Sequence, residues 1–310
     1  MELCEKILLL KSIDGLGKKA LSSININELK DVDENSIWYY IDNLKINNRR
    51  IKPPEKIEQK QELVQTVKYK IKKTRDLGIS IITKNDSNYP EKMLRLNYPP
   101  AILFAQGNIK NLAKRGVAVI GSRTPSKLGM LVAKRFGEFL SERGFSVISG
   151  LANGCDAAAH EGALSKSGIT IAVMPSPLDN IYPKTNIDLY KKIISSDGCT
   201  ISEYAIGEKI HKSNFIERDL LQCALSDGII VAEAGEKSGT MHAVNGGVSL
   251  NMPIGCFDFT DNHYMNFKQS SGNKMLITSN KAISLCETKS IEEFLKKCTK
   301  NQQKQLSLFF

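Results

Sequence analysis

Residues 115–150 read RGVAVIGSRTPSKLGMLVAKRFGEFLSERGFSVISG, and this stretch indicates the fold class of the chain. It begins with an apolar run bounded by glycine, Arg115–Gly121, which is typical of a fully buried strand. Apolar residues then recur at helical spacing from Leu128 to Leu140, and a second short apolar run follows at residues 145–149. The order strand, helix, strand predicts a parallel βαβ unit.

Short apolar runs and helical patterns continue to alternate on both sides of this unit. Upstream, the runs GISIIT and AILFAQG start at Gly78 and Ala101. Downstream, we expect further strands at 169–174, 199–203, 228–232 and 253–257, and helices near 155–167, 186–196, 218–225 and 239–250. This order predicts an α/β fold with a doubly wound, mostly parallel sheet of the extended Rossmann-like type. Such sheets bind ligands in the loops beyond the carboxyl ends of their strands.

The two ends of the chain have a different pattern. Residues 1–50 read as short helices, and the charged stretch around Pro53 and Pro54 favours a linker. A longer helix is expected near residues 55–77, with Gly78 as its C-cap. We therefore expect three parts: a small helical domain and linker over 1–70, an extended Rossmann-like domain over 71–287, and a C-terminal helix with a flexible tail over 288–310.

A glycine-containing turn interrupts the first helices. Gly15 and Gly17 separate two apolar helical stretches, and Lys18 and Lys19 follow them. The pattern is typical of half of a helix-hairpin-helix, whose glycine turns offer backbone N–H groups to a phosphate, or of a plain glycine helix stop. The residues leave both interpretations open.

The charge balance favours a polyanionic partner without deciding which one. The formal net charge is +10 at pH 7 and the isoelectric point is about 9.1. A basic protein binds nucleic acid by releasing counterions, but many lysine-rich proteins have no such partner. No apolar run reaches the length of roughly 18 residues that a membrane span needs, so we expect no membrane partner.

The cysteines and the N-terminus indicate a cytoplasmic protein. The chain has seven cysteines, an odd and scattered set without a C-x-x-C pair, and its four histidines cluster with none of them. Free thiols in a reducing compartment fit this pattern better than disulfides or a zinc site, so we expect no metal. The start MELCEKILLLKSIDG lacks the cleavage site of an export signal and reads as a helix.

The first loop that carries chemistry runs from Gly121 to Ser126, between the first strand and its helix. Gly121 allows a close turn, Ser122 offers a hydroxyl, and the planar fork of Arg123 suits a phosphate. The helix that follows offers free backbone N–H groups. The loop lacks both G-x-G-x-x-G and G-x-x-x-x-G-K-[ST], so neither a dinucleotide cofactor nor a nucleoside triphosphate is expected. A capped helix with a surface arginine is the alternative.

The second loop contains Ser149 and Gly150 and leads into a helix with Asp156 and His160. Its small residues let a phosphate or another backbone come close. A carboxylate and a histidine four residues apart also occur in catalytic sites, but no serine or cysteine nucleophile accompanies them. We favour helix capping and packing for this pair, and we expect no catalytic residue.

Two further loops repeat the combination of turn residues with a cation. Residues 177–186 contain Tyr182, on which a base could stack, and Lys184; a surface turn with a buried tyrosine is an equal alternative. Residues 233–240 place Lys237, Ser238 and Gly239 at the start of a helix. Together the four loops predict a phosphate-rich ligand at one edge of the sheet.

Taken in order, these segments resemble the DNA-processing protein A (DprA/Smf) family. The resemblance covers about residues 78–285 and lies in seven ordered blocks, which include GVAVIGSRTPSKLG, SGLANGCDAAAHEGAL, LDNIYPKTN, ISEYAIG, SDGIIVAEAGEKSGTMHAV and NKMLITSNKA. It implies an extended Rossmann fold that binds single-stranded DNA in a basic pocket without catalysis. It also implies a homodimer, and delivery of the DNA strand to the RecA recombinase during DNA uptake.

The resemblance also assigns residues to the DNA pocket. Arg123 and Lys184 take the cationic role, and the remaining expected contacts are Gly121, Ser122, Ser149, Gly150, Asn214, Arg218, Lys237, Ser238 and Gly239. One block departs from the family pattern. NFIERDLLQCALS, at 214–226, has Asp219 and Leu220 where an asparagine–arginine pair is usual, and this exchange weakens or reshapes the expected DNA surface.

The C-terminal tail has a second resemblance. Gln305, Leu306, Ser307, Leu308 and Phe309 read QLSLF, which is similar to the pentapeptide that bacterial proteins insert into the sliding clamp. A polar leash would present the apolar side chains as anchors and the glutamine as the group that fixes register. The alternative is that the tail folds onto the surface of this protein or frays.

Two other functions remain as alternatives. The first is a phosphoribohydrolase-like enzyme of the related Rossmann-like group, which carries a PGGxGTxxE signature. The corresponding stretch EAGEKSGTMHA has no carboxylate at its last position, Ala243. The second is a sensor module that binds a small nucleotide without turnover.

Overall fold

The central element of the fold is a mixed β-sheet. A computed structural model describes residues 1–259 and 268–306. In this part of the chain, nine strands form one sheet in the order β1-β2-β6-β5-β4-β3-β7-β8-β9. The strands are β1 Ser80–Thr83, β2 Ile102–Gly107, β3 Gly116–Ile120, β4 Ser146–Ser149, β5 Thr170–Met174, β6 Cys199–Ser202, β7 Gly228–Val231, β8 Ile254–Phe257 and β9 Ile283–Leu285.

Most neighbouring strands are parallel, and the sheet is doubly wound around β3. β1 and β2 are antiparallel, as are β2 and β6, whereas every other neighbouring pair is parallel. From β3 the chain adds β4, β5 and β6 on one side, and it then crosses to add β7, β8 and β9 on the other. The predicted Rossmann-like class is confirmed. The order reverses between β3 and β7, where such sheets bind their ligands.

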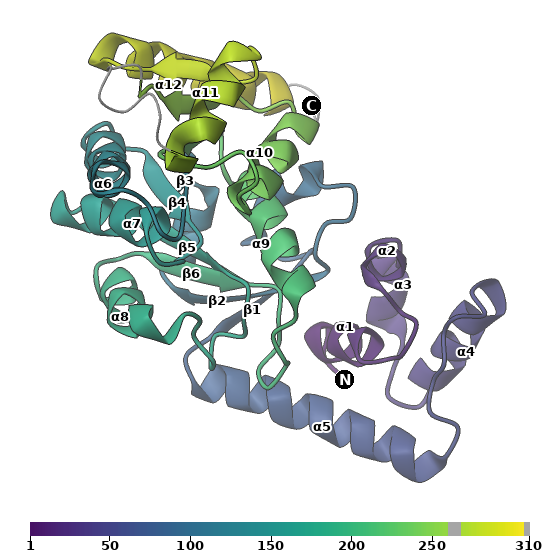
Figure 1. The fold of residues 1–310 in the computed structure, drawn as a ribbon. Helices are drawn as coiled ribbons and strands as arrows, with labels where there is room; N and C mark the ends of the chain where they lie inside the picture. The colour runs from purple at the N-terminus through teal and green to yellow at the C-terminus, as the bar shows by residue number, and fades with distance from the viewer. Residues whose placement is uncertain (260–267, 307–310) are drawn as a thin grey trace.

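Alternate residues of the buried strands face two different helix layers (Figure 1). Val117 and Val119 of β3 pack in one apolar cluster with Phe136, whereas Ala118 and Ile120 pack in another with Val244. A strand buried on both faces is apolar throughout, which is the pattern that predicted these strands. The first layer contains α6 Lys127–Glu142, α7 Cys155–Ser165 and α8 Ile187–Ser195, and the second contains α9 Lys212–Leu225, α10 Thr240–Ser249 and α11 Ser271–Thr278.

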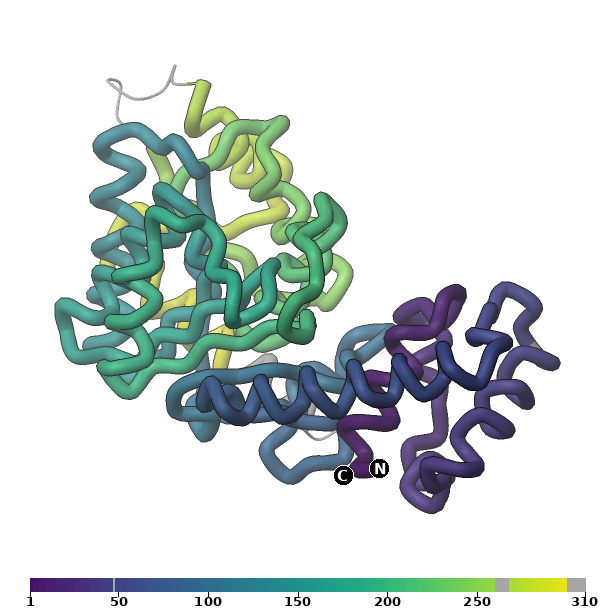
Figure 2. The backbone as a smooth tube through the Cα atoms, turned by 90° about the horizontal axis from the view of Figure 1, so that it is seen from below, coloured from purple at the N-terminus to yellow at the C-terminus, as the bar shows by residue number. Residues whose placement is uncertain are grey.

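The N-terminal region is helical, and it packs onto the β1 end of the sheet. Its helices are α1 Leu3–Lys11, α2 Lys18–Ser22, α3 Ile26–Asp31, α4 Ile37–Asn47 and α5 Ile57–Asp76. Figure 2 shows α5 running from the other N-terminal helices to the sheet. Val64, Val67 and Ile71 form one face of α5 and are buried in the same apolar cluster as α1. Residue 70 lies inside α5, and the change from helix to strand comes at Gly78, whose φ of +68° ends the helix as expected.

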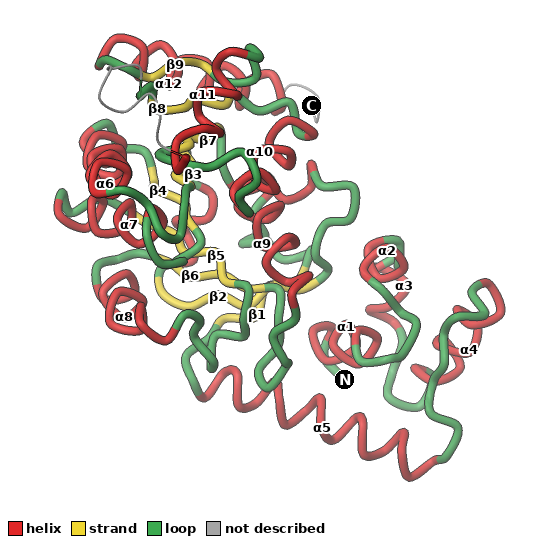
Figure 3. Tube along the Cα trace, viewed as in Figure 1, coloured by secondary structure: helices red, strands yellow, loops and turns green. Residues whose placement is uncertain are grey.

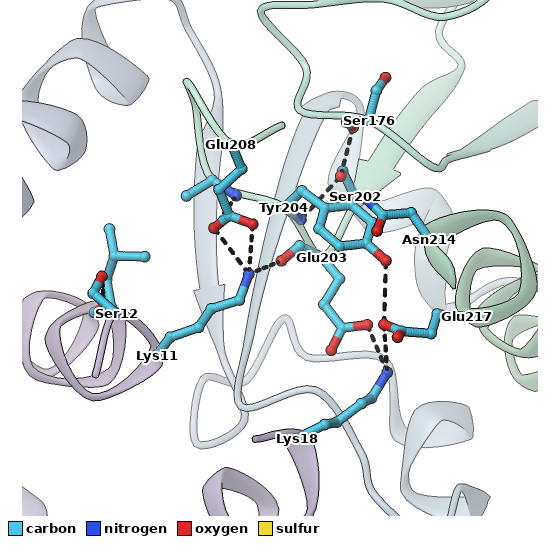
Figure 4. A network of polar contacts seen from close by, with 12 residues as sticks. Lys11, Ser12, Lys18, Ser176, Ser202, Glu203, Tyr204, Glu208, Asn214 and Glu217 are labelled. Atoms are coloured by element: carbon cyan, nitrogen blue, oxygen red, sulfur yellow. Dashed lines mark hydrogen bonds and ion pairs between the residues drawn. The ribbon is translucent and has the colours of Figure 1, made fainter. Parts of the chain in front are cut away.

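Gly15 and Gly17 of the turn between α1 and α2 are exposed, but the lysines on either side of the turn are engaged by the rest of the protein. Figure 4 shows Lys11 and Lys18 directed toward carboxylates of the segment that follows β6 and of α9. The Lys18 Nζ lies 2.7 Å from a carboxylate oxygen of Glu203 and 4.0 Å from one of Glu217. Lys11 pairs with Glu208 at 3.1 Å. These ion pairs favour the glycine helix stop over a phosphate-binding turn.

The C-terminal part differs from the expectation in two respects (Figure 3). The three-residue strand β9 was not predicted, because so short a run has no periodicity. Helix α12, Thr288–Leu306, extends through the residues that were expected to form a polar leash before the pentapeptide. Its residues Phe294 and Leu295 are buried with α6. Of the clamp-like pentapeptide, Ser307, Leu308 and Phe309 lie outside the described residues.

Three further properties concern the whole described chain. Short 3₁₀ helices lie at η1 Glu91–Arg95, η2 Ile109–Ala113, η3 Lys184–Asn186 and η4 Lys268–Ser270. All seven cysteines are free thiols, and only that of Cys286 is exposed. Within residues 1–259 and 268–306, no helix combines the length and the apolar character that a membrane crossing requires.

Candidate nucleic-acid interface

The loops after β3, β4, β5 and β7 border two hollows at the carboxyl edge of the sheet. The smaller one, the Tyr182 hollow, has a volume of about 50 Å³ and is lined by Arg123, Gly150, Asn153, Tyr182, Phe215 and Arg218, among others. The larger one, the Gln222 hollow, has a volume of about 310 Å³; its own lining includes Ser122, Asp156, Asp219, Gln222, Ser238 and Thr240. Arg123, Ala152, Phe215 and Arg218 line both hollows, so the two are adjoining.

An aromatic pair and an arginine form the wall between the hollows. The guanidinium carbon of Arg123 lies 5.2 Å from the ring centroid of Phe215. The ring of Tyr182 meets Phe215 edge to face, with 5.5 Å between centroids. Arg123 is exposed, and Tyr182 is 42% exposed, so the buried-tyrosine alternative is wrong. The exposed ring of Tyr182 and the half-buried ring of Phe215, beside a cation, suit the stacking of bases.

Arg218 lies beneath this wall and is held by carboxylates. It is 4% exposed, and its guanidinium lies 3.1 Å from Oδ1 of Asp219 and 3.7 Å from Oδ2 of Asp156. A Cβ atom on Gly150 would lie only 1.1 Å from Nη1 of Arg218, so glycine is required to make room for the guanidinium. Arg218 is one of the residues predicted from the sequence to contact DNA. In the structure its charge is instead engaged by its own protein.

Asp156 and His160 have packing roles, as favoured above, but the carboxylate does not cap its own helix. The Oδ2 atom of Asp156 accepts hydrogen bonds from the backbone N–H groups of Gly150 and Ala152 in the preceding loop. Burial raises the pKa of Asp156 to about 6, although Arg218 opposes the shift. The Nδ1 atom of His160 lies 2.6 Å from the hydroxyl of Thr170, and burial lowers the pKa of this histidine to about 3.

The predicted phosphate cradle at the start of α6 is already occupied by the protein. The carboxylate of Glu233, which is 1% exposed, accepts from the backbone N–H of Ser126 at 3.1 Å and from its hydroxyl at 2.5 Å. The backbone N–H of Ser122 donates to the carbonyl of Glu233. A carboxylate at a helix N-terminus takes the place that an external anion would take. Arg123 therefore remains as the anion-binding group of this loop.

The loop after β7 leaves polar atoms free at the Gln222 hollow. The hydroxyl of Ser238 and the Nε2 of Gln222 are buried, and neither has a hydrogen-bond partner in the described structure. Gly239 lies beside them at the start of α10, and Lys237 is exposed on the same loop. Buried polar groups without partners are costly, so each is a candidate for pairing with a ligand.

The structure brings together seven of the residues predicted from the sequence. The hollows are lined by Gly121, Ser122, Arg123, Gly150, Arg218, Ser238 and Gly239. Lys184 and Lys237 are exposed and adjoin lining residues along the chain; Lys184 also donates to the side chain of Asn180 at 3.0 Å.

Two predicted residues do not face a ligand. Ser149 is fully buried, and its hydroxyl donates to the carbonyl of Val119 at 2.7 Å. Asn214 is 4% exposed and donates to the carbonyl of Pro175 at 3.2 Å, which fixes the loop that borders the Tyr182 hollow. Both residues position the loops instead of lining the site.

Phe215, Asp219 and Gln222 line the Gln222 hollow and were not among the predicted site residues. They follow one another at intervals of four and three residues along α9, a spacing that places them on one helix face. This spacing was the available signal. A mixed apolar and polar face of this kind is also typical of ordinary packing, so the signal is weak without the fold.

The chain lacks a carboxylate at the position that corresponds to the glutamate of the phosphoribohydrolase signature. Ala243, which takes the place of the catalytic glutamate in that signature, is 3% exposed on α10. In the part of the chain that the structure describes, no three side chains of histidine, cysteine, aspartate or glutamate are grouped to hold a metal ion.

The comparisons with known proteins find relatives that agree with one another. The model of the family described as DNA recombination-mediator protein A matches residues 80–296. Protein Smf of Borreliella burgdorferi is 30% identical over 80% of this chain and 76% of its own length. DNA processing protein DprA of Bacillus subtilis is 32% identical over 54% of this chain and 56% of its own length. Protein Smf of Synechocystis is 35% identical, but the alignment spans only 41% of that relative.

Two solved structures are similar as well. The DNA processing protein A of Streptococcus pneumoniae superposes with a TM-score of 0.76 at 26% identity, over 94% of this chain and 98% of that one. The DNA processing protein A of Helicobacter pylori, described by its single-stranded DNA binding mode, has a TM-score of 0.62 at 29% identity over 71% of this chain and 96% of that one. With the predicted resemblance confirmed on these grounds, the chain belongs to the DNA recombination-mediator protein A family.

Proposed function

We propose that this protein binds single-stranded DNA along the two adjoining hollows and acts in DNA processing without a catalytic step of its own. The observation that carries the proposal is the wall between the hollows, in which the exposed Arg123 and Tyr182 flank the half-buried ring of Phe215. Single-strand binding sites combine stacking rings with cations that follow the backbone. The relative from Helicobacter pylori, which is described as binding single-stranded DNA, supports the same conclusion.

The cations are placed so that they suit a sugar–phosphate chain passing over the wall. Arg123 lies at the wall itself, Lys184 follows the ring of Tyr182, and Lys237 precedes Ser238 at the far hollow. All three side chains are exposed, so they can reach phosphates without a rearrangement of the protein. Bases would then turn toward the aromatic rings, and the backbone would stay on the cationic side.

The proposal is tested by the affinity of a fluorescently labelled oligothymidylate for single-residue variants. Arg123→Ala and Lys184→Ala should each weaken binding, independently of base sequence, because they remove backbone contacts. Lys72→Ala is the matched control, since Lys72 is an exposed lysine of α5 and lines neither hollow. Unchanged affinity in the Arg123→Ala/Lys184→Ala double variant would refute the assignment.

Three partner assignments belong to the same proposal. By resemblance, the protein acts as a homodimer and hands the bound strand to a RecA-type recombinase. The C-terminal QLSLF segment attaches it to a sliding clamp, on the strength of its similarity to the clamp-binding pentapeptide. Removal of residues 305–310 should abolish capture by the clamp and leave DNA binding intact. Capture that persists would contradict the tether.

The sensor-module alternative is distinguished by competition. If the ligand is a small nucleotide rather than a strand, nucleoside monophosphates should displace a labelled oligonucleotide at concentrations near those of the unlabelled oligonucleotide. For a strand-binding protein we expect much weaker displacement, since a mononucleotide makes contacts along only part of the track. Incubation with nucleoside monophosphates, followed by detection of free base, tests the hydrolase alternative directly.

A further inference from the structure

We infer that the Gln222 hollow is a base-binding subsite that prefers guanine. The inference rests on the proposed binding of single-stranded DNA and goes beyond it, because it assigns one class of base to one hollow. Three features support it: the charges at the floor of this hollow, the polar atoms there that lack hydrogen-bond partners, and the side chain at position 219.

The floor of the Gln222 hollow is a poor site for a phosphate. Its one buried cation, Arg218, is shared between the carboxylates of Asp156 and Asp219. The carboxylates of Asp156 and Asp219 themselves line the hollow. The cations that remain available, among them Arg123, are exposed at the rim. A phosphate is therefore favoured at the rim, and the floor is left for an uncharged group.

The same floor offers polar atoms that can form hydrogen bonds with the edge of a base. The Nε2 of Gln222 and the Oγ of Ser238 are buried and lack partners in the described residues. Gln222 is 1% exposed, and a buried amide without a protein partner costs free energy that a ligand can recover. Phe215 lines the hollow and offers a ring against which a base can pack. A base that enters would pair these polar atoms and cover its own faces.

Asp219 decides which base fits. Its Oδ1 faces Arg218, whereas no described residue donates a hydrogen bond to its Oδ2. A carboxylate only accepts hydrogen bonds, so it selects a base edge that carries donors. Guanine presents two adjacent donors, the N1–H and the N2 amino group, and next to them the O6 acceptor, which the amide of Gln222 suits. Thymine, adenine and cytosine each present a single donor group on this edge.

The family pattern in the sequence analysis has an asparagine where this chain has Asp219. An asparagine side chain offers both a donor and an acceptor and accommodates several bases. Replacing its amide by a second acceptor oxygen removes the donor. At position 219, the exchange that was expected to weaken the DNA surface is, on this inference, a gain of base selectivity.

The test uses oligothymidylates that carry one deoxyguanosine, moved through every position in turn, with binding followed by fluorescence anisotropy. At one register, wild-type protein should bind the guanine-containing strand about tenfold more tightly than the all-thymine strand. Deoxyinosine, which lacks only the N2 amino group, should lose most of that gain at the same register. Deoxyadenosine and deoxycytidine should give none.

The variant arm compares Asp219→Asn with the wild type on the same set of strands. We expect the guanine preference to fall from about tenfold to less than twofold, each strand being compared with the all-thymine strand bound by the same variant. Equal affinity for every base at every position in the wild type would overturn the subsite and leave the proposed function standing. An absence of binding to any of the strands would overturn both. The inosine comparison needs no variant, so a poorly folding Asp219→Asn protein does not prevent the test.

Discussion

The contact between Gly150 and Arg218 is the tightest packing constraint in the site. Any side chain at position 150 would occupy the space of the guanidinium, because its Cβ would lie 1.1 Å from Nη1. We predict that Gly150→Ala destabilises the protein by about 1–3 kcal/mol, the usual range for overpacking, and reduces DNA binding by moving Arg218 toward the wall. Denaturant titration and anisotropy measure the two effects.

The control for that variant is Gly17→Ala. A Cβ on Gly17 meets no atom within 4 Å, and its φ of −71° suits any residue. Its effect on the free energy of unfolding should stay below about 1 kcal/mol, the scale of a helix N-cap exchange. Equal losses in the two variants would show that the Gly150 contact has no special role.

His160 gives the protein a defined sensitivity to acid. Its pKa is about 3 in the folded protein, against an ordinary value of 6.5. Between these two values the unfolded chain binds a proton that the folded chain does not, so the stability contributed by neutral His160 is lost as the pH falls through this window. Asp156 acts in the opposite direction between its ordinary value of 3.8 and about 6, because the folded protein takes up its proton first.

Comparison of His160→Asn with the wild type isolates the histidine, since Asp156 and all other groups are common to both. The asparagine amide can still meet the hydroxyl of Thr170, which the ring nitrogen reaches now. Relative to the wild type, the free energy of unfolding of the variant should rise by about 1.4 kcal/mol for each pH unit lowered from 6 to 4. Parallel stability curves over that range would contradict the buried neutral histidine.

At the scale of single residues, the sequence predicted those whose roles depend only on their neighbours along the chain. Arg123 is exposed at a strand end because the loop that carries it is short and polar, and both properties are visible in the sequence. Ser149 was assigned wrongly, because no local pattern shows that its hydroxyl bonds to β3. Glu233 closes the start of α6 from 107 residues away, and only the folded chain brings them together.

Helix α9 is the element that joins the site to the N-terminal helices. One face carries Phe215, Asp219 and Gln222 to the hollows. Glu217, from the same helix, lies 4.0 Å from Lys18 and accepts a hydrogen bond from the Tyr204 hydroxyl at 3.2 Å (Figure 4). The helical region therefore contacts the helix that lines the proposed DNA site.

We predict that Lys18→Ala loosens this contact. Glu203, which is 7% exposed, would lose its partner at 2.7 Å, and the loss should cost about 1 kcal/mol. Hydrogen exchange should show faster opening of amides in α1 and α2. Lys19→Ala is the matched control, since Lys19 is exposed and makes no ion pair in the described structure. Equal exchange in the two variants would contradict the role of Lys18.

Elements were the most predictable level of this structure. Strands such as β3 and β7 are continuously apolar because both of their faces are covered, and this left a clear pattern in the sequence. The strand β9 was missed because three residues set no period. The end of α12 was missed because Lys- and Gln-rich residues favour a helix and a solvated tail to a similar degree.

At the scale of the whole molecule, the net charge of +10 does not translate directly into DNA-binding surface. Lys11 and Lys18 are engaged with carboxylates across the contact between the helical region and the sheet. The proposed DNA track depends instead on Arg123, Lys184 and Lys237, which are exposed beside the two hollows. The net charge indicated a polyanionic partner, but only the fold shows which cations lie beside the hollows.

The most direct test of the account is the salt dependence of binding to single-stranded and double-stranded DNA. For single strands, each phosphate contact contributes about 0.7 to the slope of log affinity against log salt concentration. We predict tighter binding to single than to double strands, and a slope lower by about 1.4 in the Arg123→Ala/Lys184→Ala variant, which loses two contacts. Equal affinity for both forms of DNA, or an unchanged slope in the variant, would contradict the proposed track.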